Sequence, residues 1–247
     1  MSNRPSVYQE PNAEAIALAR RLLRSARFGS LAVLEPDDGG FPHASRVALG
    51  MDIDGVPVTL VSGLAAHTRA LHHDPRCSLL VGEVGKGDPL AHPRMSLRCR
   101  AHLVEGDSPS HHMLRARYLR RHPKAQLYVD LPDFRFFRLL PVAASLNGGF
   151  GRAYQIDPHF LQITSPARQS LAAKEQDQLD ILNMSVSDIP RRLATLQIKK
   201  TSGQWTVVGL DAAGLDLASK DQFLRVEFNH ELASVDELAS ELHKLYG

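Results

Sequence analysis

Residues 62–81 read Ser-Gly-Leu-Ala-Ala-His-Thr-Arg-Ala-Leu-His-His-Asp-Pro-Arg-Cys-Ser-Leu-Leu-Val. This stretch begins where the apolar run 58–62 ends, and it finishes in a second apolar run, so it connects two predicted strands. Its middle part concentrates histidine, arginine and hydroxyl side chains, and residues 65–68 are expected to start a short helix. The stretch therefore predicts a strand, a polar connection and a strand, and it raises the question of what the connection binds.

The surrounding sequence predicts a mainly antiparallel sheet. Strands are expected at 30–35, 43–50, 58–62, 77–83, 95–105 and 135–140, and helices at 12–27 and near 109–121. The turn residues at 36–40 join the first two strands as a hairpin. Because the strands between 30 and 62 follow one another without helices, a closed or nearly closed antiparallel barrel is favoured over a parallel doubly wound sheet.

The pattern changes after residues 156–158. A polar helix is expected at 170–183, strands within 205–217 and at 223–228, and a final helix at 234–245 that opens with a capping-box pattern. We therefore predict an α+β protein with a split-barrel domain at 1–160 and a smaller α/β domain at 161–247. The basic runs at 20–24 and 115–121 are expected to form solvated helix faces.

The connection is compatible with three kinds of site: a metal site, a catalytic nucleophile or an anion-binding site. A metal is weakly supported, because His67 and His72 have only Asp74 nearby as a further ligand, and no metal is predicted. A nucleophile is less favoured still, because neither Ser62 nor Cys77 lies in a recognisable catalytic turn. We name no catalytic residue.

An anion suits the connection best. The start of a short helix after Ser62 offers free main-chain amides, and Thr68 and Arg69 add a hydroxyl and a guanidinium group. Arg46 on the preceding strand is expected to point toward the same gap, with Ser45 and its neighbour on the opposite face. These residues predict a phosphate pocket.

Composition limits which partners and which cellular compartment are expected. The chain has 247 residues and a formal net charge of +2, so no strong field would attract nucleic acid, and none is predicted as a partner. No apolar run has the length of a signal peptide or a membrane span, and we expect a cytoplasmic protein without a membrane partner. The two cysteines, Cys77 and Cys99, lie in apolar runs and are interpreted as small buried hydrophobic residues.

Seven motifs follow one another in a fixed order within residues 14–156. They are Ser-Arg-Val at 45–47, the 60–71 and 74–81 parts of the connection, Gly-Lys-Gly-Asp-Pro-Leu at 85–90, Tyr-Leu-Arg-Arg-His-Pro at 118–123, Asp-Phe-Arg-Phe-Phe-Arg at 133–138 and Gly-Gly-Phe-Gly-Arg-Ala at 148–153. Their joint order resembles the FMN-binding split-barrel proteins related to pyridoxamine 5′-phosphate oxidase, and within them the haem-utilisation (HugZ-type) branch.

The resemblance implies a six-stranded barrel that forms a homodimer, with FMN at the subunit interface. It implies that the FMN phosphate is held by the four residues of the pocket above, and that His67 lies beside the phosphate or the ribityl chain. Lys86 and Asn147 are candidates for the isoalloxazine end, although Lys86 is equally well explained as a solvated loop lysine. The cofactor-binding residues predicted are Arg46, Ser62, His67, Thr68, Arg69, Lys86 and Asn147.

The chain departs from the resembled family at two places. The helix expected at 170–183 ends in Ile-Leu-Asn-Met-Ser-Val at 181–186, where relatives usually have His-Met-Asn-x-Asp-His, so both histidines are absent. Cys99 stands where relatives tend to have a glycine on a barrel strand, which would either weaken flavin binding or reshape the pocket.

The resemblance leaves two functions open. One is an FMN-dependent oxidoreductase with a small molecule or haem as its substrate; the other is a haem-binding or regulatory split-barrel protein without flavin.

Overall fold

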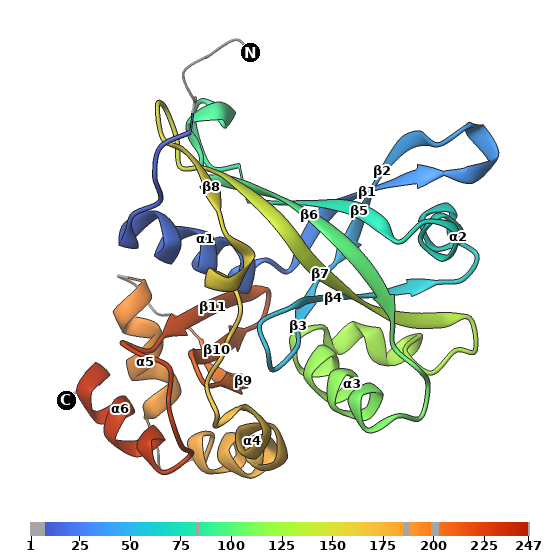
Figure 1. The fold of residues 1–247 in the computed structure, drawn as a ribbon. Coiled ribbons are helices and arrows are strands. Elements are labelled where there is room, and N and C mark those ends of the chain that lie inside the picture. The colour runs from blue at the N-terminus through green and yellow to red at the C-terminus, as the bar shows by residue number, and fades with distance from the viewer. Residues whose placement is uncertain (1–7, 83, 185–187, 199–202, 247) are drawn as a thin grey trace. The chain divides into compact units, whose positions relative to one another are not determined.

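The computed structural model describes residues 8–82, 84–184, 188–198 and 203–246, and the chain divides into two compact units (Figure 1). The first unit draws on residues up to 50, on 56–111 and on 126–162. The second draws on 51–55, on 112–125 and on residues from 163 onward. Among the described residues, no helix combines the length and the apolar character needed to cross a membrane.

The first unit is built on an eight-stranded sheet in the order β2-β1-β5-β6-β7-β4-β3, with β8 paired to β7. Its ends approach each other, because Thr59 Oγ1 on β4 donates to the Ala48 carbonyl oxygen on β2 at 2.9 Å. The sheet is therefore curled into the predicted antiparallel split barrel, with more strands than the six implied by the resemblance. The strands are β1 (Phe28–Glu35), β2 (Phe41–Ala48), β3 (Gly50–Met51), β4 (Pro57–Ser62), β5 (Arg76–Val81), β6 (Arg94–Leu103), β7 (Phe134–Asn147) and β8 (Ala153–Ile156).

Alternating side chains give this sheet an inner and an outer face. Along β5, Cys77, Leu79 and Val81 are buried while the residues between them are exposed. The same alternation on β6 buries Met95, Leu97 and Cys99. The period of two places these apolar residues together inside the barrel, as the sequence predicts.

Helix α1 (Ala13–Ser25) begins at the predicted cap, since the Asn12 side chain accepts from the Ala15 amide. It buries Ala15, Ala19 and Leu23, which recur at helical spacing. Helix α2 (Ala66–His73) forms the polar connection between β4 and β5 and packs against β1. Both helices predicted for this part of the chain are confirmed.

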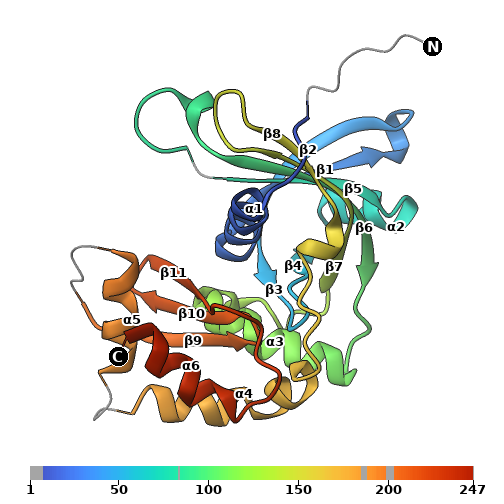
Figure 2. The ribbon, with the colours of Figure 1, turned by 60° about the vertical axis from the view of Figure 1, so that its left-hand side comes forward.

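The second unit contains a three-stranded antiparallel sheet in the order β11-β10-β9 with helices packed around it (Figure 2). The stretch 205–217 forms two strands, because Ala212 and Ala213 make the turn between them. Helix α5 was not predicted from the sequence. The elements are α4 (Arg168–Leu182), α5 (Ile189–Gln197), β9 (Thr206–Asp211), β10 (Gly214–Ser219), β11 (Gln222–Glu227) and α6 (Glu237–Tyr246).

Helix α3 (Pro109–Arg121) contributes most of its length to the second unit. Arg117 pairs there with Glu175, and Arg121 Nη1 lies 3.0 Å from Asp216 Oδ2. Both arginines are buried, so the prediction of a solvated basic face at 115–121 is wrong. The guanidinium groups leave water because carboxylates on α4 and β10 neutralise them.

Candidate functional site

The connection after β4 is a closed hydrogen-bonded turn. Ser62 Oγ donates to Asp133 Oδ2 at 2.5 Å and accepts from the Leu64 amide at 3.1 Å. Thr68 is 1% exposed, and its hydroxyl donates to the Ser62 carbonyl oxygen at 2.6 Å. These two predicted phosphate ligands are thus engaged within the chain.

The main-chain amides of this turn are also largely occupied. The Gly63 amide donates to the Asp133 carbonyl oxygen at 2.6 Å, and the Ala65 amide to the Ser62 carbonyl oxygen at 3.2 Å. Arg69 remains available, since it is 66% exposed and lies 3.8 Å from Asp37 in a loose surface pair. An anion bound at this turn would have to compete with the carboxylate of Asp133.

His67 meets Ser45 across the gap between α2 and β2, where Ser45 Oγ and His67 Nδ1 lie 3.0 Å apart. Burial of the ring lowers the pKa of His67, and the nearby His43 lowers it further. His72 takes a different partner, because its ring packs edge-on against Phe137 with centroids 5.5 Å apart. Among the described residues, no group of three metal-binding side chains is placed to hold an ion.

The predicted direction of Arg46 is wrong. Ser45 and the buried Val47 share the face that looks toward α2, so Arg46 projects from the outer face of β2. Its guanidinium carbon lies over the Phe28 ring, 5.5 Å from the centroid. Strand alternation fixes this outcome, since adjacent side chains point to opposite faces.

A surface pocket of about 240 Å³ lies beside Phe28, at the start of β1. The lining residues with polar side chains are Arg21 and Ser25, which are one helical turn apart on α1. None of the described residues bonds to either side chain, and no carboxylate is among the lining residues described. The remaining lining residues are Leu22, Ala26, Gly82 and Pro93.

This pocket combines an apolar wall with free donors, and Arg46 stands over the ring that forms part of it. Such a lining suits a ligand with a flat apolar body and an anionic group. Arg21, Ser25 and Phe28 are not among the residues that the sequence pattern predicts. Their helical spacing was visible, but which part of the sheet would lie beside them was not.

Lys86 and Asn147 lie near this end of the sheet. Pro93 and Gly82 bracket the loop that carries the exposed Lys86, whose carbonyl oxygen lies 3.0 Å from His92 Nε2. Asn147 pairs with Arg94 in the sheet, and its side chain accepts from the Gly149 amide at 3.1 Å.

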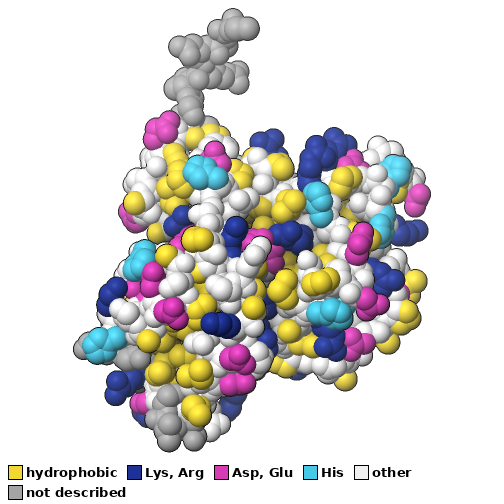
Figure 3. All heavy atoms as spheres, turned by 60° about the horizontal axis from the view of Figure 1, so that its bottom comes forward, with side chains coloured by type: hydrophobic (Ala, Val, Ile, Leu, Met, Phe, Trp, Pro, Cys, Tyr) yellow, Lys and Arg dark blue, Asp and Glu magenta, His cyan; other side chains and the backbone are white. Residues whose placement is uncertain are grey.

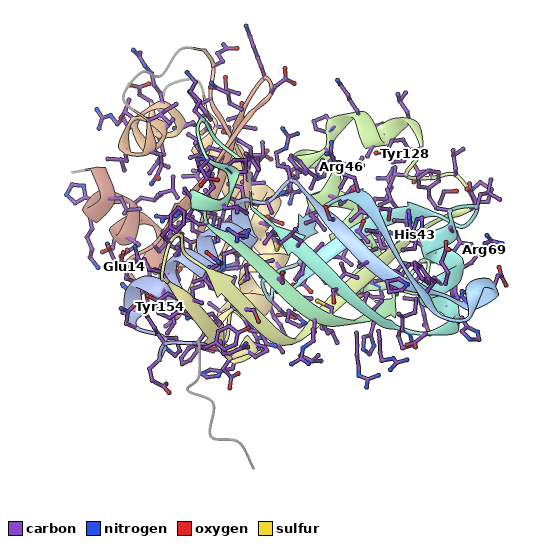
Figure 4. The ribbon with its side chains drawn as sticks, turned by 90° about the horizontal axis from the view of Figure 1, so that it is seen from above. Glu14, His43, Arg46, Arg69, Tyr128 and Tyr154 are labelled. Carbon is purple, nitrogen blue, oxygen red and sulfur yellow. The ribbon has the colours of Figure 1, made fainter. Side chains whose placement is uncertain are left out.

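The seven predicted residues therefore fall into two groups. Ser62 pairs with Phe134, the first residue of β7, whereas Asn147 is the last residue of β7. These two residues therefore lie toward opposite ends of this 14-residue strand. Figure 4 shows Arg69 and His43 together toward the α2 end, with Arg46 farther along the sheet. The α2 group is Ser62, His67, Thr68 and Arg69; the α1 group is Arg46, Lys86 and Asn147.

The two departures from the resembled family, Cys99 and the missing histidines at 181 and 186, lie in different parts of the structure. Cys99 is 2% exposed and faces the barrel interior, away from the outer-face residue Arg46. Ile181 is 55% exposed near the end of α4, and Val186 lies outside the described residues. Between them Asn183 bonds to both main-chain groups of Val207 at 2.8 Å, which gives this shared residue a structural role.

A family model described as pyridoxamine 5′-phosphate oxidase matches residues 17–147. The chain belongs to the pyridoxamine 5′-phosphate oxidase family. A non-canonical haem oxygenase of Arabidopsis thaliana chloroplasts is 32% identical over 135 residues, which cover 55% of this chain and 40% of that relative. The chain thus spans less than half the length of this curated relative.

Two solved structures match nearly the whole chain. A protein of unknown function from Agrobacterium tumefaciens is 30% identical, with coverage of 98% of this chain and 100% of its own and a TM-score of 0.82. A haem binding protein from Mycobacterium smegmatis is 28% identical, with coverage of 99% and 98% and a TM-score of 0.54. The predicted family is confirmed, and the similarity to the haem binding protein supports the predicted branch.

Proposed function

We propose that this family member is an FMN-binding flavoprotein and an oxidoreductase that works as a homodimer. The observation that carries the proposal is the amphipathic pocket beside Phe28, with the guanidinium groups of Arg21 and Arg46 near it and no carboxylate among its described lining residues. The donors suit a phosphate group, and the apolar wall suits a flat ring. A bound flavin would supply hydride or electron transfer, while the chain binds and orients it.

The separation of the two residue groups supports a dimeric site. Ser62 and Asn147 lie toward opposite ends of β7, and a straight strand of 14 residues spans about 43 Å, which exceeds the reach of one flavin nucleotide. Arg46, whose neighbour Ser45 contacts His67, lies between these two ends. The α1 group of one subunit and the α2 group of its partner can then serve one ligand. In this arrangement Arg69 contributes from the partner side, and the closed turn around Ser62 positions it.

The outer face of the sheet supports the same association. Ser30 pairs with Leu80, Leu80 with Ser96, and Ser96 with Ser145, so three serines and one leucine form a row across four strands. The serines of this row allow a partner to approach closely there, and exposed Phe28 and Leu80 supply apolar area. We propose that a second copy of the chain covers this face.

A haem-binding protein without flavin is the second candidate. It is favoured by the full-length similarity to the Mycobacterium smegmatis haem binding protein. Against it stands Ile181, at the position of one of the two family histidines. A third candidate, on the same fold, is a flavoprotein that has haem as its substrate.

The test is an absorbance spectrum of the purified protein followed by titrations with FMN, riboflavin and haem. We expect a yellow protein that, once stripped, binds FMN more tightly than riboflavin, because only FMN carries the phosphate. Binding of haem with no binding of FMN would favour the second candidate. Sedimentation analysis checks the dimer, and a monomer that binds FMN would overturn the two-subunit site.

A further inference from the structure

Cys77 and Cys99 face each other directly across the β5–β6 ladder. Both are free thiols, and the chain contains no other cysteine. The Cys77 sulfur lies 3.8 Å from the Cys99 carbonyl oxygen, so its side chain is turned toward the opposite residue. We propose that these two residues are a dithiol site that a peroxide oxidises reversibly to an intramolecular disulfide.

The sheet holds the two residues at a suitable separation. Two positions along the same ladder, the Ala101 amide donates to the Pro75 carbonyl oxygen at 2.8 Å. Hydrogen-bonded and non-hydrogen-bonded pairs alternate along an antiparallel ladder, so Cys77 and Cys99 are also a hydrogen-bonded pair. The Cα atoms of such a pair are about 5.5 Å apart, within the range of about 4.4–6.8 Å found in disulfides. No strand has to move along its neighbour for the bond to form, but the Cβ atoms, about 5.5 Å apart in such a pair, have to draw in to about 3.5–4.5 Å.

The two thiols have different roles. The hydrogen bond from Cys99 lowers the pKa of Cys77, whereas the same contact and burial raise the pKa of Cys99. Cys77 also lies one residue from the start of β5 and is 8% exposed, against 2% for Cys99. Cys77 is therefore the residue that reacts first, and Cys99 is the resolving residue.

The chemistry balances with hydrogen peroxide as the oxidant. The Cys77 sulfur attacks one peroxide oxygen, the O–O bond breaks, and Cys77 becomes a sulfenic acid with release of one water. The Cys99 sulfur then attacks the Cys77 sulfur, an S–S bond forms, and the second water leaves with the thiol proton. Both sulfurs are oxidised by one electron each and the peroxide is reduced; a dithiol reductant reverses the reaction by exchange.

The test treats the full-length protein with increasing hydrogen peroxide and then alkylates the remaining thiols. We expect the intact mass to show loss of the two thiol hydrogens, non-reducing digestion to yield one cross-linked peptide pair, and dithiothreitol to restore both thiols. Every thiol signal comes from this pair, because no other cysteine is present.

Single variants test the order of events. In Cys99→Ala we expect a Cys77 sulfenic acid that dimedone traps, and in Cys77→Ala we expect Cys99 to stay reduced at the same peroxide dose. Circular dichroism first verifies that each variant is folded. Two unreacted thiols in the wild type, or a disulfide formed only between chains, would overturn the proposal, as would faster oxidation of Cys99 than of Cys77. None of these readouts depends on bound flavin.

Discussion

Ser45 on β2 and His67 on α2 are joined by a hydrogen bond between Oγ and Nδ1, 3.0 Å long. This contact lies on the face of β2 that looks toward the helix. Strand alternation turns Arg46 to the outer face, where it stands over Phe28. The pairing of β2 with β1 and the burial of Val47 set this orientation, and the hydrogen bond marks the face of β2 opposite to Arg46.

The lowered pKa of His67 predicts a pH dependence of stability. In the unfolded chain this ring titrates near 6.5, and in the folded chain below that value. When the pH falls through 6.5, the unfolded state takes up the proton first, so the contribution of His67 to folding stability decreases. Above that pH the contribution is constant.

Urea unfolding of the wild type and of His67→Gln on both sides of pH 6.5 checks this sign. We expect the wild type to lose more stability than the variant as the pH falls, because the other titrating groups are common to both proteins. Equal losses would contradict the prediction.

Arg46→Gln is expected to weaken FMN binding. Loss of a charge-assisted hydrogen bond of about 1.5–3 kcal/mol corresponds to roughly 10- to 100-fold in affinity. Riboflavin binding should change little, because riboflavin lacks the phosphate. Fluorescence titration of both flavins measures the difference.

Arg69→Gln serves as the matched comparison, because Arg69 is an exposed arginine of the other residue group. If only Arg46 matters, the phosphate is bound at the α1 pocket. If both variants lose affinity, the two-subunit site is supported. Unchanged FMN affinity in Arg46→Gln would reject the role assigned to that residue.

Asp211→Asn is expected to destabilise the second unit by about 3–5 kcal/mol. Asp211 accepts from both Arg225 Nη atoms, at 2.8 and 2.6 Å, and from the Ala213 amide at 2.9 Å. Arg225 is 1% exposed, so the substitution leaves a buried guanidinium group with too little negative charge around it. The free energy of unfolding in urea measures the loss.

The control for Asp211→Asn is Asp177→Asn, which removes an exposed carboxylate from α4 in the same unit. A surface change of this kind should alter stability by no more than about 0.5 kcal/mol. A similar small effect for Asp211→Asn would show that the Arg225 cluster adapts to the missing charge.

Asn183→Ala is expected to destabilise the second unit by about 1–3 kcal/mol. Its amide bonds both the N–H and the C=O of Val207, so alanine leaves two groups at the edge of β9 without their partner. Lys174→Ala on the exposed face of α4 is the control. A thermal unfolding midpoint equal to that of the control would count against a structural role for Asn183.

Part of this protein follows from the sequence alone. Period-two alternation in 76–81 and 94–103 identified the strands and their buried side chains, and the Asn12 cap marked the start of α1. The ordered motifs within 14–156 identified the family. These features depend on residues close together in the chain, so short-range sequence patterns are enough to predict them.

Tertiary structure alone decided the rest. The outward direction of Arg46 followed from the pairing of β2 with β1 and the burial of Val47, which place Ser45 beside His67, 22 residues away, on the opposite face. The burial of Arg117 and Arg121 required carboxylates from 58 and 95 residues away. The pocket required α1 to lie beside the 82–93 loop. In each case the partner is distant in sequence, and a charge or a free donor acquires its role only from the partner that folding places beside it.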